Sequence, residues 1–336
     1  MELHVLVFDV ICTMHYGLPY KTKQFFFVLI KLSIVVGAFY FIYTKISEND
    51  NLEFSTFVDF LRENNTFSFK NILFLVILSG FNWFFEILKW EKLVGTIKKI
   101  TFKNAMEQSL AGLTTSLITP NRIGDYGAKA VYYPKPFRKR IVLLNLLSNM
   151  AQMTITVILG CIGFIVFVNQ HPIEIDYYKI SRFGLLLIII GIFTIFGIKY
   201  KPLIIKGYSL QRIINYIKEM PTKTHILNLF LSFLRYLIFS FQFYYLLTTF
   251  GVFIGYSTAM VVITSMYLLA SIVPSISIFD VVIKGSIAVY LFDFLAVNEL
   301  TILSIIAVMW ILNFAIPSGL GSYYVLNFKF PKTQAE

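Results

Sequence analysis

Long apolar segments are the feature that most restricts how this chain can fold. Eight such segments follow one another, and each comes close to or exceeds the roughly 17–25 residues that a helix needs to cross a bilayer core. They occupy residues 24–43, 71–89, 141–168, 183–199, 225–250, 256–273, 278–297 and 301–326. The pattern predicts an all-α polytopic membrane protein of about eight transmembrane helices, with crossing and re-entry both open for 278–297.

The composition excludes the soluble classes. Hydrophobic residues make up 57% of the 336 residues and charged residues only 14%, whereas soluble domains carry about 25% charged residues. A soluble domain of this length could not bury so much apolar surface. Disordered and collagen-like chains are excluded for the same reason.

Basic residues outnumber acidic ones by 29 to 18 and lie mainly in the connections between apolar segments. Counted by loop, 21 Lys and Arg residues fall on one side of the predicted spans and five on the other. Because cytoplasmic loops are enriched in Lys and Arg, both termini are expected in the cytoplasm. The same rule accounts for the net charge of +11 without a nucleic-acid partner.

Three regions follow from this topology. Residues 1–20 form a cytoplasmic segment (Met14 is an alternative start), 21–326 a single transmembrane domain, and 327–336 a cytoplasmic tail. Within the most basic cytoplasmic stretch, residues 105–120 are too short and polar to span and too apolar for an ordinary loop. They predict a re-entrant or interfacial helix, ended by Pro120.

The densest polar cluster, TPNRIGDYGAKA, follows at residues 119–130. In a helix, Arg122, Asp125 and Lys129 share one face, and Asp125 pairs with Lys129 at the favourable four-residue spacing. Such a group could hold an anionic headgroup or fix a re-entrant hairpin. The alternative is a basic loop without special chemistry.

The third span carries three amides on one stripe, at Asn145, Asn149 and Gln152. Amides within a span face the protein interior or a wet cavity rather than lipid. They predict either hydrogen bonds between helices or one wall of a polar groove.

Charges within spans mark functional sites because burying them in a membrane is unfavourable. Arg235 lies deep in the fifth span, and Asp280 and Lys284 follow SIVPSIS, where Pro274 predicts a broken helix. We expect these three charges to form one site. Near the end of the second span, Glu86 and Lys89 are expected to extend to the membrane surface. Asn313 and Pro317 predict a kink in the last span.

Catalytic and cofactor signatures do not stand out. The chain has no Walker loop, dinucleotide fingerprint, HExxH or Gly-x-Ser-x-Gly motif. Four histidines and two cysteines (Cys12 and Cys161) show no ligand or disulfide spacing. We therefore expect no cofactor, no metal and no catalytic residue.

Three motifs resemble the transmembrane region of bacterial lysylphosphatidylglycerol synthases and its stand-alone relatives. They are Pro120-x-Arg122-x-Gly124-Asp125, the Pro-containing break from Pro274 to Lys284, and the ending Trp310–Ser322. The similarity covers about residues 20–326. It implies a bacterial inner-membrane protein that moves lipids between leaflets. Many relatives have Glu at Asp125 and a glycine-rich stretch in place of PSISIFD. No aminoacyl-transfer domain is expected here, so lysine transfer by that route is not expected.

The leading hypothesis is a flippase-like translocator of an anionic phospholipid or lipid-linked precursor. Arg122 and Lys129 would gather the headgroup at the cytoplasmic face, while Arg235 and Lys284 would carry it at depth. Asp125 and Asp280 would balance these charges in the empty state. The alternatives are a transferase acting on a polyprenyl-phosphate donor, with Glu174 and Asp176 as its acidic pair, and a non-catalytic subunit of a membrane enzyme.

Overall fold

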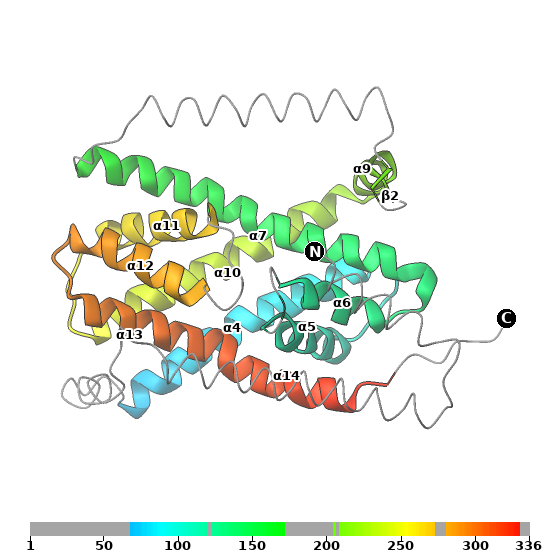
Figure 1. Cartoon of the computed structure of the whole chain (residues 1–336), viewed down its shortest axis with the longest axis horizontal. Helices are drawn as coiled ribbons and strands as arrows, with labels where there is room; N and C mark the ends of the chain where they lie inside the picture. The colour runs from blue at the N-terminus through cyan, green and yellow to red at the C-terminus, as the bar shows by residue number, and fades with distance from the viewer. Residues whose placement is uncertain are drawn as a thin grey trace.

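The computed structural model describes residues 68–117, 119, 122–171, 204–205, 208–272 and 280–329 (Figure 1). The expected spans at 24–43 and 183–199, the acidic pair at Glu174 and Asp176, and the Pro274 break lie outside these residues. The described elements are α4 (Phe69–Val94), α5 (Phe102–Leu117), α6 (Ile123–Val131), α7 (Lys135–Gln170), β1 (Ile204–Ile205), β2 (Tyr208–Ser209), α9 (Leu210–Glu219), α10 (Thr222–Thr249), α11 (Tyr256–Ile272), α12 (Asp280–Asp293), α13 (Glu299–Trp310), η2 (Ile311–Ala315) and α14 (Ile316–Asn327).

Within the described residues, four helical segments are long and apolar enough to cross a membrane: α4, α7, α10 and the continuous run Glu299–Asn327 formed by α13, η2 and α14. The predicted all-α polytopic membrane class is therefore confirmed. Two further apolar helices are shorter, with 17 residues in α11 and 14 in α12. At 1.5 Å per residue, α12 spans only about 21 Å, less than a bilayer core of about 30 Å.

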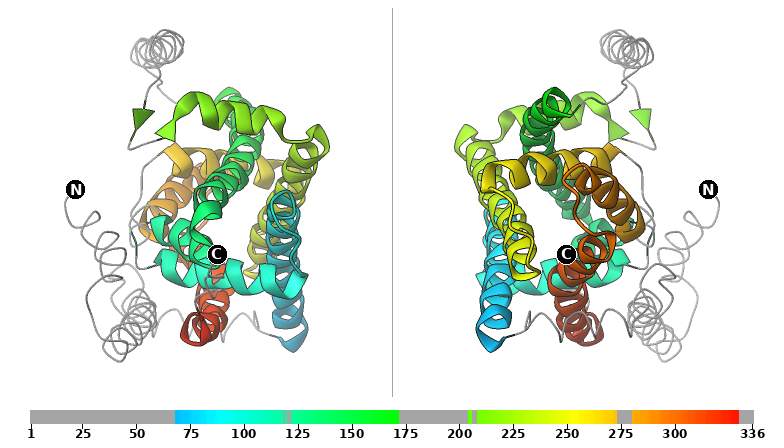
Figure 2. Two further views of the ribbon diagram at one scale, coloured as in Figure 1. Left: turned by 90° about the vertical axis from the view of Figure 1, so that its right-hand side faces the viewer. Right: turned by 90° about the vertical axis from the view of Figure 1, so that its left-hand side faces the viewer.

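The short helices form two packed pairs that lie against opposite halves of α7 (Figures 1 and 2). In the first half of α7, Asn145 bonds to α6. In the second half, Gly160 lies against Leu268 and Gly163 against Thr264, both on α11. The helix expected at residues 105–120 is α5. The first pair is α5 with α6, and the second pair is α11 with α12.

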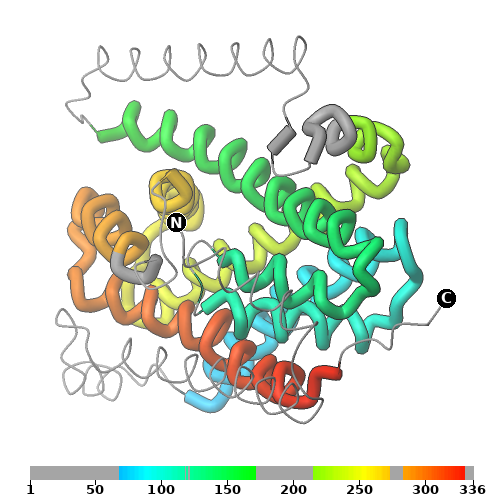
Figure 3. Tube along the Cα trace, turned by 45° about the vertical axis from the view of Figure 1, so that its right-hand side comes forward, coloured from blue at the N-terminus to red at the C-terminus, as the bar shows by residue number. Residues whose placement is uncertain are grey.

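The last span completes the packing around both pairs. Thr114 of α5 donates a hydrogen bond of 2.9 Å to the carbonyl oxygen of Ser318 in α14. At the other end of the span, Gly285 of α12 lies against Leu303 of α13. Figure 3 shows this span running along both pairs. Each pair is thus held between α7 and one half of the last span.

The last span contains one stretch of irregular helix. Residues Ile311–Ala315 form a π-helical stretch, η2, and Pro317 follows at the beginning of α14. The sequence predicted a kink near Asn313 and Pro317, and the structure places a π-helical stretch at Asn313. Single π-helical turns occur frequently at functional sites. The residues around η2 are therefore candidates for the functional site.

Apolar side chains both fill the core and cover the outside. The main core joins α10, α11, α12 and α13 through residues such as Phe243, Met266 and Ile305. On the outer face of α7, Ile162 is 58% exposed and Ile165 61%. A helix that carries apolar side chains on its outside as well as its inside is suited to contact with lipid.

Candidate functional site

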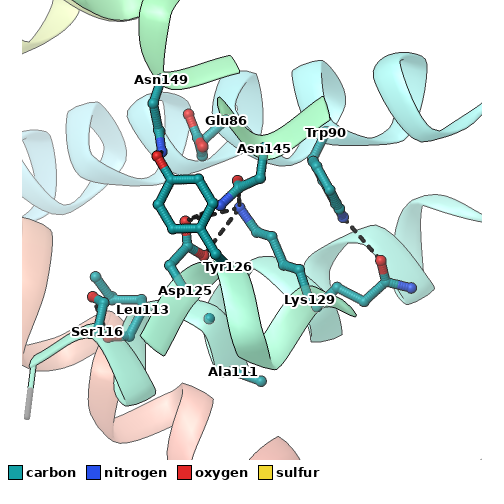
Figure 4. A network of polar contacts seen from close by, with 12 residues as sticks. Glu86, Trp90, Ala111, Leu113, Ser116, Asp125, Tyr126, Lys129, Asn145 and Asn149 are labelled. Atoms are coloured by element: carbon teal, nitrogen blue, oxygen red, sulfur yellow. Dashed lines mark hydrogen bonds and ion pairs between the residues drawn. The ribbon is translucent and has the colours of Figure 1, made fainter. Parts of the chain in front are cut away.

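A buried charge cluster joins α6 to α7 (Figure 4). The Lys129 ammonium lies 3.1 Å from Asp125 Oδ1 and donates a hydrogen bond of 2.8 Å to Asn145 Oδ1. Asn145 Nδ2 in turn donates to Asp125 Oδ2 at 2.8 Å. The Lys129 ammonium also lies 4.5 Å from the centroid of the Trp90 ring. The predicted pairing of Asp125 with Lys129 is confirmed, and Asn145 closes the triangle.

Glycines allow α5 and α6 to approach closely enough to form this cluster. A Cβ at Gly112 would collide with the Asp125 carboxylate, and a Cβ at Gly124 would collide with the carbonyl oxygen of Thr115. Hydrogen bonds reinforce the contact. The Thr115 hydroxyl donates to the Gly124 carbonyl oxygen at 3.0 Å, and Gly124 N–H donates to Thr119 Oγ1 at 2.8 Å. Gly124 of the Pro-x-Arg-x-Gly motif therefore has a packing function.

A second buried cluster joins α4 to α10. Arg235 Nη1 lies 2.7 Å from Glu86 Oε2, and the Lys89 ammonium lies 2.9 Å from the same oxygen. Arg235 Nε also donates to Asn82 Oδ1 at 2.9 Å. The expectation that Glu86 and Lys89 extend to the membrane surface was wrong. Both are buried because α10 brings the Arg235 guanidinium to the same level of α4.

Asn313 connects this cluster to η2 through its side chain and its backbone. Its Oδ1 accepts a hydrogen bond of 2.8 Å from Asn82, and its Nδ2 donates to Gln242 Oε1 at 2.9 Å. Trp83 Nε1 donates to the Asn313 carbonyl oxygen at 3.1 Å. Sequence reasoning missed Asn82 and Gln242, although amides inside apolar spans were a usable signal.

The neighbouring residue, Phe314, brings together the two helix pairs. The guanidinium carbon of Arg122 lies 5.8 Å from the centroid of the Phe314 ring, and the Lys284 ammonium lies 5.7 Å from it. Arg122 directly precedes α6, and Lys284 lies early in α12. The beginnings of α6 and α12 therefore meet at the same aromatic ring. Cation–π contacts of this kind attract a cation to the face of an aromatic ring.

The surroundings of the two cations differ. Arg122 is exposed and has left-handed backbone angles (φ 57°, ψ 26°), a conformation that is unfavourable for a residue other than glycine. Lys284 is half-buried and lines a narrow cavity with Tyr267, Trp310 and Phe314. Tyr267 is buried, and its hydroxyl has no hydrogen-bond partner among the described residues.

The remaining predicted site residues do not lie together in one site. Asn149 is exposed and donates to the Tyr126 hydroxyl at 2.9 Å, whereas Gln152 donates to the Ser232 carbonyl oxygen at 3.4 Å. The three amides therefore do not line one wall. The expected site of three charges is not formed as one contact group among the described side chains. Arg235 contacts α4, Lys284 contacts Phe314, and the Asp280 side chain lies outside the described part.

The apolar crossing helices, together with the buried charge clusters between them, define a multi-pass helical membrane protein with a polar interior. The chain belongs to the family of the lysylphosphatidylglycerol synthase TM region, whose match covers residues 28–326. This confirms the resemblance carried by the motif at Pro120–Asp125 and indicates a lipid-related function. A search of curated proteins finds no match.

Proposed function

We propose that this protein moves an anionic phospholipid or a lipid-linked precursor between the leaflets of the bacterial inner membrane, with both of its termini in the cytoplasm. The observation that supports this most directly is the convergence of Arg122 and Lys284 on Phe314. In this proposal the headgroup binds where the two short helix pairs meet, and the acyl chains stay in the lipid outside.

The charges at this junction suit an anionic headgroup. Arg122 forms no ion pair with another described residue and is held over an aromatic ring, so its positive charge is available to a ligand. No side chain caps the beginning of α6, whose partial positive charge adds to that of Arg122. Helix beginnings that meet at mid-membrane depth are a recurrent way for transporters to bind anionic groups.

The buried clusters take supporting roles in this proposal. Lys129 is paired with Asp125, and Arg235 shares the Glu86 carboxylate with Lys89. A buried cation that already contacts a carboxylate is less available to a second anion. We assign headgroup binding to Arg122 and Lys284 because they converge on one aromatic ring, and we assign to Lys129 and Arg235 the positioning of the helices around it.

Leaflet exchange tests this proposal. The purified chain is placed in liposomes with fluorescent anionic or zwitterionic lipids, and the fraction accessible to an impermeant quencher is followed over time. We expect the wild type to accelerate exchange of the anionic lipid. Arg122→Ala and Lys284→Ala should slow it about tenfold or more, because each removes a charge-assisted contact.

The control is Lys135→Ala, which removes an exposed positive charge at the start of α7 and should leave the rate unchanged. If the wild type exchanges no lipid, or if Arg122→Ala and Lys284→Ala exchange as fast as the control, the translocator proposal fails. A group-transfer assay with a Glu174→Ala/Asp176→Ala variant would then test the transferase alternative.

A further inference from the structure

We propose a second anion-binding site, distinct from the junction at Phe314, that takes a phosphate group from either a lipid headgroup or soluble phosphate. It is a hollow of about 250 Å³ where α4 ends, α5 begins and α6 turns into α7. Its polar lining includes Lys98, Lys99, Asn104, Glu107, Gln108 and Tyr132. It does not depend on the translocator proposal.

Gln108 provides a fixed hydrogen-bond donor in this hollow. Its Oε1 accepts hydrogen bonds of 2.9 Å from both Trp90 Nε1 and the Tyr133 hydroxyl. An indole N–H can only donate, so the amide atom that faces Trp90 must be the oxygen. The amide orientation is thereby determined, and no described residue accepts a hydrogen bond from the Nε2 group. Gln108 is only 5% exposed, and its Nε2, which is not one of the fully buried atoms without a partner, is accessible from the hollow that Gln108 lines.

Two lysines supply the positive charge. Lys98 and Lys99 are exposed and form no ion pair with an acidic residue in the described part of the chain. The hollow also contains one acidic residue, Glu107, which lies against the Tyr132 hydroxyl. Burial, followed by the nearby Glu107 carboxylate, raises the pKa of Tyr132 well above its usual range. The tyrosine thus stays neutral at physiological pH, and the charged side chains of the hollow sum to a positive value.

The ligand chemistry follows from these groups. Two ammonium groups and two side-chain amides can donate together to the oxygens of one phosphate, and hydrogen bonds to ionised groups are the strong ones. The hollow lies just beyond the last residue of α4, at the depth where a crossing helix reaches the headgroups. Exposed Lys92, Lys103 and Lys135 lie on α4, α5 and α7 but outside its lining. Basic pockets at this depth attract anionic headgroups.

Two probes distinguish the sources of the phosphate. The full chain is placed in phosphatidylcholine nanodiscs, and the binding of radiolabelled inorganic phosphate is measured at equilibrium. In parallel, native mass spectrometry counts the phosphatidic acid molecules that stay bound after release from nanodiscs containing that lipid. Binding of inorganic phosphate indicates a soluble ligand, and binding of phosphatidic acid alone indicates a lipid headgroup. Retention of neither probe by the wild type overturns the proposal.

Variants tie the binding to this hollow. Lys98→Ala/Lys99→Ala and Gln108→Glu should each weaken binding of the retained probe about tenfold or more, since each removes donors to a charged group. Gln108→Glu keeps an oxygen toward Trp90 and Tyr133 but places a carboxylate where the Nε2 donor was.

The matched control, Lys92→Ala/Lys103→Ala, removes two positive charges from the same surface outside the lining and should leave affinity within about twofold. An equal loss in this control, or unchanged binding in Lys98→Ala/Lys99→Ala, overturns the proposal. If Gln108→Glu does not fold, the comparison of Lys98→Ala/Lys99→Ala with its control still tests the proposal.

Discussion

The side chains of Asp125 and Lys129 are 11% and 3% exposed, so neither charge has water as an alternative partner. A buried ion pair of this kind adds little net stability compared with an apolar pair, but the loss of one member leaves an uncompensated charge. Its spacing of four residues along α6 could be predicted from the sequence. The partners of Glu86 could not, because Arg235 lies 149 positions away on another helix.

A double-variant comparison tests this account of the pair. Asp125→Ala should destabilise the protein by about 3–5 kcal/mol, because Lys129 stays buried without its carboxylate. Asp125→Ala/Lys129→Met should be more stable than Asp125→Ala, since the uncompensated ammonium is gone. Unfolding of the purified variants in detergent measures both values. A double variant no more stable than Asp125→Ala would show that the buried charge is not the cause.

At the scale of elements, close backbone packing determines where the short helices lie. α5 and α6 approach at Gly112 and Gly124, and α5 and α14 approach at Gly321, where a Cβ would collide with the Leu110 carbonyl oxygen. The sequence predicted α5 as a helix too short and polar to span. It did not show that α5 packs against α14, because nothing in the local pattern identifies the partner of a glycine.

Two glycines of α6 provide a matched test of this packing. Gly124→Ala should destabilise the protein by about 1–3 kcal/mol, because the added methyl group collides with the Thr115 carbonyl oxygen. Unlike a side chain, this backbone group cannot adopt another rotamer. Gly127→Ala should be neutral or stabilising by up to about 1 kcal/mol, since a Cβ there contacts nothing within 4 Å and alanine favours the helix. Thermal unfolding in detergent measures both, and equal effects would contradict the packing argument.

At the scale of the whole molecule, the crossing helices give the two ends of the protein different chemistry. α4 and α10 pack antiparallel, since Tyr245 bonds to Asn71 near one end and Arg235 to Glu86 further along. The loop at 250–255 therefore lies opposite the end that carries Lys98 and the basic start of α7. By the distribution of Lys and Arg, the basic end is expected in the cytoplasm.

Cysteine labelling tests this orientation. In a chain with Cys12 and Cys161 replaced by alanine, Lys98→Cys and Phe253→Cys each introduce one exposed thiol, and Phe253 is 89% exposed. A membrane-impermeant maleimide added to right-side-out vesicles should label Phe253→Cys alone, and both variants after permeabilisation. Labelling of Lys98→Cys alone in intact vesicles would reverse the predicted topology.

The sequence by itself determined the membrane class, the crossing segments seen in the described part, the helix at residues 105–120 and the pairing of Asp125 with Lys129. These features depend on hydrophobic length and on spacing within one helix, and both are local properties of the chain. Only the tertiary structure decided that Asn82 and Gln242 meet at Asn313, and that Arg122 and Lys284 share the Phe314 ring. Such contacts depend on how distant helices pack, which no local pattern encodes.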